Sequence, residues 1–297
     1  MAAPDDWREL YPFRSHELTL GRHRCHYVDE GSGPVLLLLH GNPTWSFYWR
    51  DLVRAWRDRY RVVAVDLIGC GLSEKPPATE YSYRLAQRVA DIGQLIETLD
   101  LRDITLVAHD WGGGIGMGAA VAAPKRFARF VLMNTAAFRA PRCPWQIRMC
   151  HVPGLGQVAV QGLNLFVRAA LRTTVSKPER MTPAVRAGYL APYDSWANRV
   201  GVYRFVLDIP LHAGHPSYQT LVDIEEGLAK FRQHPVCLIW GMQDWCFSPW
   251  FLERFVDFFP QAEVHRLADA GHYVVEDAHE EIAPLVEQFV QKHLSNP

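Results

Sequence analysis

Several common sequence signals are missing from this chain of 297 residues, and each absence narrows what the protein can be. The formal net charge is −1 at pH 7, so no basic excess points to nucleic acid. The amino-terminal stretch has neither the basic nor the apolar segment of a signal peptide. The apolar run Val35–Leu39 is far too short to cross a bilayer. No internal repeat is visible. A globular protein without nucleic-acid partners is therefore expected.

Cysteine is present but not in any pattern that binds metal or forms a disulfide framework. The six cysteines show no CxxC spacing, and Cys237 lies within the strand-like run Val236–Trp240. A reduced, cytoplasmic protein is the interpretation we favour, although an even number of cysteines permits disulfides. We expect neither a metal site nor a cofactor. The cysteines are Cys25, Cys70, Cys143, Cys150, Cys237 and Cys246.

Apolar residues are plentiful, at 48% of the chain with ten tryptophans, which is enough for a large core. The length suits one large α/β domain with an insertion, or two small domains. Strand patterns alternate with helical patterns, which predicts an eight-stranded, mostly parallel sheet covered by helices on both faces. The first two strands are expected at an edge. Strands are predicted at 17–20, 24–29, 35–39, 61–67, 104–107, 129–135, 236–240 and 262–267, and helices at 45–59, 83–99 and 281–293.

The alternation stops between residues 138 and 225, where prolines and short helical patterns such as Val158–Leu171 replace the strands. We predict a helical cap there, inserted into a core formed by residues 1–137 and 226–297. Residues 139–220 hold ten Lys and Arg against three Asp and Glu, a net charge of +7 that leaves −8 for the rest. We expect these basic groups to pair with an acidic core face. An acidic partner, an anionic membrane surface or self-association into a homo-oligomer are the alternatives.

The segment Ala108-His-Asp-Trp-Gly112 follows the strand predicted to begin at Ile104 and precedes a helix rich in small residues. Small residues on both sides of Asp110 allow a tight turn that lifts its side chain off the sheet at a helix amino terminus. This spacing is typical of the nucleophile elbow of α/β-hydrolases, with aspartate in the place of serine. A carboxylate is already ionised at neutral pH, so Asp110 can attack an electrophilic carbon directly. The alternative is that Asp110 only caps the helix.

An ester on Asp110 must be hydrolysed, and His272 is the expected base because Ala270-Gly-His272 follows the last predicted strand. The base needs a carboxylate partner. The strand before the cap ends without an acid, whereas the strand after it ends at Asp244, which we therefore choose. His40 and His109 are expected to be structural.

Four further positions complete the set near the predicted strand ends. Asp66 is expected to anchor the turn at Gly69–Gly71, and Asp269 to order the loop that carries His272. The backbone N–H groups of Asn42 and Trp111 are expected to form an oxyanion hole. The side-chain N–H groups of Asn42 and Trp111 can also hold a leaving anion such as halide. A turn residue at 42 and core packing at 111 are the alternatives.

The segments His40–Trp45, His109–Gly113 and Ala268–Tyr273 together resemble the haloalkane dehalogenases, along essentially the whole chain. The resemblance is to the subfamily usually called III. It implies that Asp110 displaces halide from an sp³ carbon of a small apolar substrate. It also implies that Asn42 and Trp111 bind the halide, and that His272, supported by Asp244, activates water to release a primary alcohol.

Other members of the superfamily offer alternative reactions. The β-lactone decarboxylases of bacterial olefin synthesis share these motifs and resemble the chain at 190–196, 208–211 and 244–247; such an enzyme needs a long apolar cavity. Epoxide hydrolases share the elbow but usually have an aromatic residue where Asn42 stands, and need two cap tyrosines, for which Tyr189, Tyr193 and Tyr203 are available. A non-catalytic binding protein is the third class. The dehalogenase is favoured because Asn42 and Trp111 have an evident use.

Overall fold

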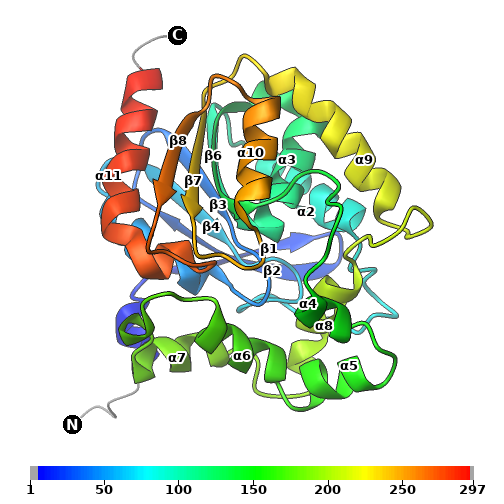
Figure 1. Ribbon diagram of the computed structural model, residues 1–297. Coiled ribbons are helices and arrows are strands. Elements are labelled where there is room, and N and C mark those ends of the chain that lie inside the picture. The colour runs from blue at the N-terminus through cyan, green and yellow to red at the C-terminus, as the bar shows by residue number, and fades with distance from the viewer. Residues whose placement is uncertain (1–5, 295–297) are drawn as a thin grey trace.

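The computed structural model describes residues 6–294. Residues 1–5, part of the stretch in which no signal peptide is predicted, and residues 295–297 lie outside the described part. The centre of the molecule is one eight-stranded sheet of order β1-β2-β4-β3-β5-β6-β7-β8 (Figure 1). β1 pairs with β2 and β2 with β4 in antiparallel fashion, and all other pairs are parallel. The strands are β1 (Ser15–Leu20), β2 (His23–Glu30), β3 (Val35–Leu39), β4 (Arg61–Val65), β5 (Ile104–Asp110), β6 (Phe127–Thr135), β7 (Val236–Gly241) and β8 (Glu263–Leu267).

Helices cover both faces of the sheet (Figure 1). One layer contains α1 and α11, which contact each other, and the other contains α2, α3 and α9. The helices of the core layers are α1 (Arg50–Trp56), α2 (Leu85–Thr98), α3 (Trp111–Ala122), α9 (Tyr218–Gly227), α10 (Pro249–Phe258) and α11 (Val274–Leu294). The short turns of 3₁₀ helix outside the insertion are η1 (Trp7–Leu10), η2 (Ser46–Trp49), η3 (Pro124–Arg126) and η7 (Leu228–Phe231).

The two faces of the sheet are both apolar because its central strands consist almost entirely of aliphatic residues. In β3, Leu37 and Leu39 belong to the cluster under α2 and α3, whereas Leu36 and Leu38 belong to the cluster under α1 and α11. Side chains alternate between faces along a strand, so a continuous aliphatic run supplies both layers at once. The predicted fold class is confirmed.

Three local expectations are corrected by the structure. Of the two strands expected at an edge of the sheet, only β1 is an edge strand, because β2 lies between β1 and β4. The last helix begins at Val274 rather than at residue 281 and is kinked at Ala278. Its first turn escaped prediction because it carries Glu276, a charged residue that is nevertheless buried, paired with Arg50 at 2.8 Å. α10 has no counterpart among the predicted helices.

Between β6 and β7 the described chain forms helices and loops only. The pattern at 158–171 is divided at Asn164, which has a φ of 55°. We propose that this segment is the predicted cap, and that it returns to the core before α9, since α9 contacts α3 and α2. Within residues 6–294, no helix combines the length and apolar composition needed to cross a bilayer. The helices of this inserted segment are α4 (Trp145–Met149), α5 (Leu155–Gln157), η4 (Val158–Gly162), α6 (Leu165–Thr173), η5 (Pro178–Arg180), α7 (Pro183–Leu190), η6 (Ala197–Arg199) and α8 (Val200–Leu207).

Candidate active site

Asp110 ends β5 and lies immediately before α3, in a backbone conformation that few side chains adopt. Its φ is 51° and its ψ is −126°. The turn is tight because the neighbouring backbone segments almost touch. A Cβ atom on Gly112 would lie 2.0 Å from the Leu39 carbonyl oxygen, and one on Gly41 would lie 2.0 Å from Oδ1 of Asp110. Glycine is therefore required at both positions, and the strain at Asp110 is held in place by its surroundings.

The two oxygens of the Asp110 carboxylate have different partners. Oδ1 accepts a hydrogen bond of 2.8 Å from the backbone N–H of Asn42, and the Trp111 backbone N–H also bonds the carboxylate. Oδ2 lies 3.7 Å from Nε2 of His272. The carboxylate makes no capping bond further into α3, which argues against a purely capping role. Burial raises the pKa of Asp110, while the nearby His272 charge and the two amides oppose that rise.

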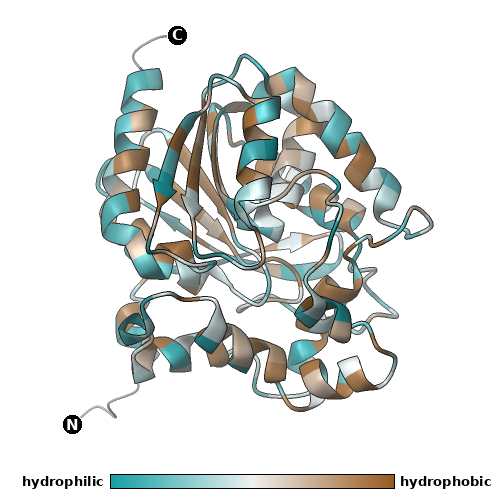
Figure 2. Cartoon of the chain, viewed as in Figure 1, coloured by the Kyte–Doolittle hydropathy of each residue, from teal (hydrophilic) through white to brown (hydrophobic). Residues whose placement is uncertain are grey.

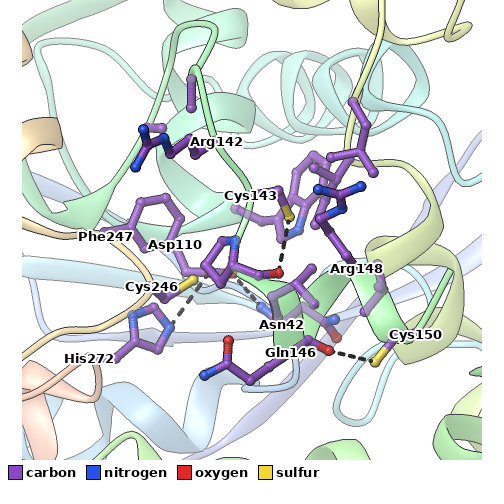
Figure 3. Close-up of a pocket in the computed structure, with 18 of the residues that line it drawn as sticks. Asn42, Asp110, Arg142, Cys143, Gln146, Arg148, Cys150, Cys246, Phe247 and His272 are labelled. Atoms are coloured by element: carbon purple, nitrogen blue, oxygen red, sulfur yellow. Dashed lines mark hydrogen bonds and ion pairs between the residues drawn. The ribbon is translucent and has the colours of Figure 1, made fainter.

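His272 follows β8 in the loop before α11, and its ring lies between the two aspartates. Nδ1 is 2.9 Å from Oδ2 of Asp244, so this nitrogen donates its proton to the carboxylate and Nε2 faces Asp110. Burial lowers the pKa of His272, but the charge of Asp244, its hydrogen bond and the charge of Asp110 together raise the pKa above its usual value. The structure therefore brings the three predicted catalytic side chains together (Figure 3 shows Asp110 and His272).

Asp244 is held by more partners than its strand-end position alone suggests. Oδ1 accepts from the backbone N–H groups of Cys246 at 2.6 Å and Phe247 at 3.0 Å. Oδ2 also accepts a bond of 2.9 Å from Nδ2 of Asn134, at the end of β6. Asn134 in turn accepts from the Gly241 N–H at 2.8 Å. Sequence reasoning missed Asn134 because it looked only for an acid at that strand end.

The two histidines predicted to be structural both make contacts with the backbone. Nε2 of His109 lies 2.8 Å from the carbonyl oxygen of His272, and its ring stacks beside Tyr48. His40 donates from Nδ1 to the Gly41 carbonyl at 2.7 Å and accepts at Nε2 from the Leu67 N–H at 3.1 Å. Burial lowers the pKa of both rings, which keeps them neutral in these contacts.

The two other strand-end acids behave differently. Asp66 accepts from the Leu72 N–H at 2.8 Å, so it does hold the turn at Gly69–Gly71. The expectation for Asp269 is wrong: it is largely exposed and pairs with Lys177 at 2.8 Å. Asp277, in the first turn of α11, instead accepts from the Gly271 N–H at 2.7 Å. The acid that orders the histidine loop therefore follows the loop instead of preceding it.

The side chains of Asn42 and Trp111 both line the cavity above Asp110 but are not equivalent as anion donors. Nδ2 of Asn42 donates to the Val202 carbonyl of α8 at 3.1 Å, and its Oδ1 is buried with no partner among the described residues. Within residues 6–294, no acceptor receives a hydrogen bond from the Trp111 indole N–H. Its ring packs against Phe205, at 5.5 Å between centroids. The indole N–H is therefore unengaged, and the Asn42 amide keeps one of its two N–H groups for a leaving anion.

A cavity of about 1210 Å³ opens above the carboxylate of Asp110 and extends under the insertion (Figure 3). Its floor is polar, with Asp110, His272 and Cys246, and burial raises the pKa of the Cys246 thiol well above its usual value, so that the thiol stays neutral. Exposed Arg142 and Arg148 border its opening. Its walls are mostly apolar and include Val160, Leu165, Phe166, Ala170, Ile209 and Leu221.

Two hydrogen bonds connect the end of α6 to the loops that carry the catalytic residues. Nε1 of Trp245, the residue after Asp244, donates to the Thr173 carbonyl at 2.9 Å. The backbone N–H of Tyr273, the residue after His272, donates to the Thr174 carbonyl at 2.8 Å. The wall of the cavity formed by α6 is thus fixed relative to both loops.

Residues 34–278 match the protein family described as the alpha/beta hydrolase fold, and the chain belongs to that family. It is 42% identical over 285 residues to a cis-3-alkyl-4-alkyloxetan-2-one decarboxylase of Shewanella oneidensis, covering 95% of this chain and 89% of the relative. It is 37% identical over 285 residues to haloalkane dehalogenase 2 of Mycobacterium tuberculosis, covering 95% and 96%. The family resemblance predicted from the motifs is confirmed.

Solved structures of haloalkane dehalogenases share the fold of this chain. The haloalkane dehalogenase DbeA from Bradyrhizobium elkani superposes with a TM-score of 0.85 at 27% identity, covering 96% of this chain and 100% of that one. The relatives thus comprise decarboxylases and dehalogenases on one framework, and the chain is a hydrolase-like enzyme by family.

Proposed function

We propose that this protein decarboxylates β-lactones that carry two alkyl chains, releasing an alkene and carbon dioxide. The cavity carries this proposal. Pockets for drug-sized ligands occupy about 300–1,000 Å³, whereas the cavity above Asp110 measures about 1210 Å³ and is lined mainly by aliphatic and aromatic side chains. A substrate with two long chains fills such a space, and a small haloalkane leaves most of it empty. The relative that is 42% identical is named for this reaction.

The first step is a displacement at the ring carbon that bears the lactone oxygen. Oδ2 of Asp110 attacks this carbon from the side opposite the oxygen, the carbon–oxygen bond breaks, and its electron pair stays on the oxygen as part of a carboxylate. Oδ1 remains held by the Asn42 amide, and the Trp111 amide also bonds the carboxylate, which orients the attacking oxygen. The indole N–H of Trp111 is available to the new carboxylate.

The second step returns the enzyme to its starting state. The bond between the neighbouring carbon and the new carboxylate breaks, its electron pair forms the carbon–carbon double bond, and the aspartyl oxygen leaves as the Asp110 carboxylate. Attack from the back places the aspartyl oxygen anti to the carboxylate. Inversion followed by anti elimination preserves the relative side of the two alkyl groups, so a cis lactone gives a cis alkene. No water is consumed.

His272 has an electrostatic role in this sequence. Burial works against ionisation of Asp110, and the imidazolium of His272 at 3.7 Å favours the charged carboxylate. Asp244 and Asp110 raise the pKa of His272, which increases the fraction that carries this positive charge at neutral pH. The same cation stabilises the carboxylate that forms when the ring opens. No proton has to leave the substrate.

The test is a paired turnover assay on the purified protein and its Asp110→Ala variant. One arm supplies cis and trans dialkyl β-lactones and measures alkene and carbon dioxide by gas chromatography. The other supplies bromoalkanes and chloroalkanes of several lengths and measures halide. We expect cis lactone to give cis alkene with the native protein and nothing with the variant. Rapid halide release without alkene contradicts the proposal.

Dehalogenation is the second candidate, supported by one feature of the site. The unengaged indole of Trp111 and the side chain of Asn42 line the same cavity, and the relative that is 37% identical is named haloalkane dehalogenase 2. In this reaction Asp110 displaces halide to form an alkyl ester, and His272 then removes a proton from water, which attacks the ester carbonyl. The two reactions share their nucleophile and differ in the fate of the intermediate.

A further inference from the structure

Large apolar side chains are exposed on the insertion to an extent that the rest of the molecule does not show. Of the twelve such side chains exposed in the described part, nine lie between residues 145 and 211. Trp145 is 71% exposed, Leu163 60% and Leu155 57%. Figure 2 shows strongly apolar stretches on α5 and α6, which lie on the side of the insertion that faces away from the sheet. Exposed apolar surface of this extent marks an interaction site.

A group of these exposed apolar residues, which we call the cap face, lies along one stretch of the insertion. Trp145 and Met149 are one turn apart on α4, Val152 lies in the turn that follows, and Leu155 and Val158 begin α5 and η4. Trp196 joins them, because a Cβ atom on Gly162 would lie 3.4 Å from its ring and 3.7 Å from Cγ1 of Val158. The cap face is defined here as Trp145, Met149, Val152, Leu155, Val158 and Trp196.

Four exposed arginines accompany the cap face and have no acid to neutralise them. Within the described part of the chain, Arg142, Arg148, Arg168 and Arg172 form no ion pair, whereas Arg139 pairs with Glu225 and Arg180 with Glu280. We expected the basic groups of the insertion to pair with the core. Arg139 and Arg180 do so, whereas within residues 6–294 the four arginines named above do not.

Few carboxylates offset these arginines. Of the three acids between 139 and 220, Asp208 is buried against Arg88 at 3.2 Å, and Glu179 follows the far end of α6. Only Asp194 is exposed near the cap face, with its carboxylate bonded to Asn198 at 2.7 Å. The surface is therefore apolar with a positive surround, which is the combination that binds an anionic lipid surface.

The opening of the cavity lies on the same side. Arg142, Arg148 and exposed Leu165 belong both to this positive and apolar region and to the lining of the cavity. On α6, Arg168 and Arg172 lie one and two turns from Leu165, so they share its face of the helix. We propose that the cap face docks on the surface of an anionic lipid bilayer, with the cavity opening towards the lipid, so that apolar substrate enters Asp110's cavity without crossing water.

Docking can be measured without substrate, by sedimenting the purified protein with vesicles of phosphatidylcholine alone or of phosphatidylcholine mixed with phosphatidylglycerol. We expect binding to the mixed vesicles that weakens with salt. Each arginine near an anionic surface strengthens binding to the vesicle. Arg168→Gln/Arg172→Gln should therefore lower the partition coefficient between vesicle and solution roughly thirty-fold. Leu155→Ser/Val158→Ser is expected to lower it as well. Neither pair lines the cavity.

The matched control is Lys125→Gln/Arg232→Gln, which removes the same charge from exposed positions before β6 and β7, at the edge of the sheet opposite the site. This variant should bind as the native protein does. Equal binding to both kinds of vesicle, no binding, or equal loss in the control overturns the proposal. So does a native mass in solution that exceeds one chain and falls in Leu155→Ser/Val158→Ser, because the cap face then binds a second copy.

Entry of substrate from the bilayer rests on the proposed function and is tested separately. Turnover of a long-chain dialkyl β-lactone in mixed vesicles should fall in Arg168→Gln/Arg172→Gln, while turnover of a short-chain lactone in solution should not. Vesicle binding without alkene from either lactone contradicts the proposed function and leaves docking in place. If the native protein and Arg168→Gln/Arg172→Gln form alkene equally fast from the long-chain lactone in vesicles, as they do from the short-chain lactone, substrate does not enter from the bilayer.

Discussion

Asn134 Nδ2 and His272 Nδ1 donate to the same oxygen of Asp244, each at 2.9 Å. The acid is therefore fixed from two strands at once, because Asn134 is the penultimate residue of β6 and Asp244 follows β7. With two further amides on its other oxygen, Asp244 has four donors. A carboxylate held this rigidly controls the orientation of the imidazole as well as its charge.

Replacing Asn134 with alanine should lower kcat by about tenfold to a hundredfold with little change in KM, because His272 loses its fixed orientation. Stability should also fall by about 1–3 kcal/mol, since the Gly241 N–H is left without its acceptor. Steady-state kinetics and thermal unfolding check both effects. Asn198→Ala, which removes an amide bonded to exposed Asp194, is the control. A change in KM alone would argue against a positioning role.

Asp110→Asn should be inactive yet more stable than the native protein at neutral pH. Burial raises the pKa of Asp110 in the folded state, so the folded protein binds its proton more tightly than the unfolded chain does. The protonated form of Asp110 therefore contributes to the stability of the fold below the usual aspartate pKa. This contribution is lost as the pH rises through the raised pKa of Asp110 in the folded state. Asparagine restores a neutral side chain at every pH. Each 1 kcal/mol gained raises Tm by about 2–4 °C, measured by calorimetry across pH, and a lower Tm would contradict this account.

His272→Phe should separate the two candidate reactions by mass spectrometry. With a haloalkane, the carboxylate needs no base for its attack, but the alkyl ester cannot be hydrolysed, so an added mass accumulates on Asp110. With a β-lactone, loss of carbon dioxide regenerates the carboxylate, so no lasting adduct is expected. The double variant Asp110→Ala/His272→Phe should carry no label. Unmodified protein after long incubation with a haloalkane that the native enzyme turns over would exclude Asp110 as the nucleophile.

Ala159→Phe should shift the preference of the enzyme towards shorter alkyl chains. Ala159 lies in η4 and lines the cavity, so a phenyl ring there takes space from the substrate. We expect kcat/KM for the longest lactones to fall about tenfold or more, while that for short ones is retained. Ala197→Phe, at an exposed position outside the cavity, should change neither value. An equal loss for all chain lengths would show that the ring disturbs the fold instead.

The sequence predicts those parts of the molecule whose requirements are local. The elbow at Asp110 is recognisable because Gly112 is required within two residues of it, and strand ends can be located from aliphatic runs such as Val35–Leu39. Asn134 was missed because its partner belongs to another strand. The start of α11 was missed because Glu276 is a buried acid, and its partner, Arg50, lies 226 residues away along the chain. The role of Asn134 and the start of α11 both depend on contacts between segments that are far apart in the sequence.

The same limit applies to the choice of reaction. Asp110, His272 and Asp244 serve both candidate reactions, so their positions do not distinguish a halide from a lactone oxygen as the leaving group. The proposal of a β-lactone rests on the volume of the cavity above them, and that volume depends on how α6 and η4 pack over the sheet. Asn42 illustrates the difference: its position was predicted, but its bond to the Val202 carbonyl comes from the packing of α8.

The bonds from Trp245 and Tyr273 to the end of α6 restrict how substrate reaches the nucleophile. An insertion that moved as a rigid body would either break both bonds or carry the loops of Asp244 and His272 with it. α4 and α5 lie outside this linked part of the insertion. Substrate that enters beside α4 and α5 therefore reaches Asp110 without disturbing the alignment of His272 and Asp244.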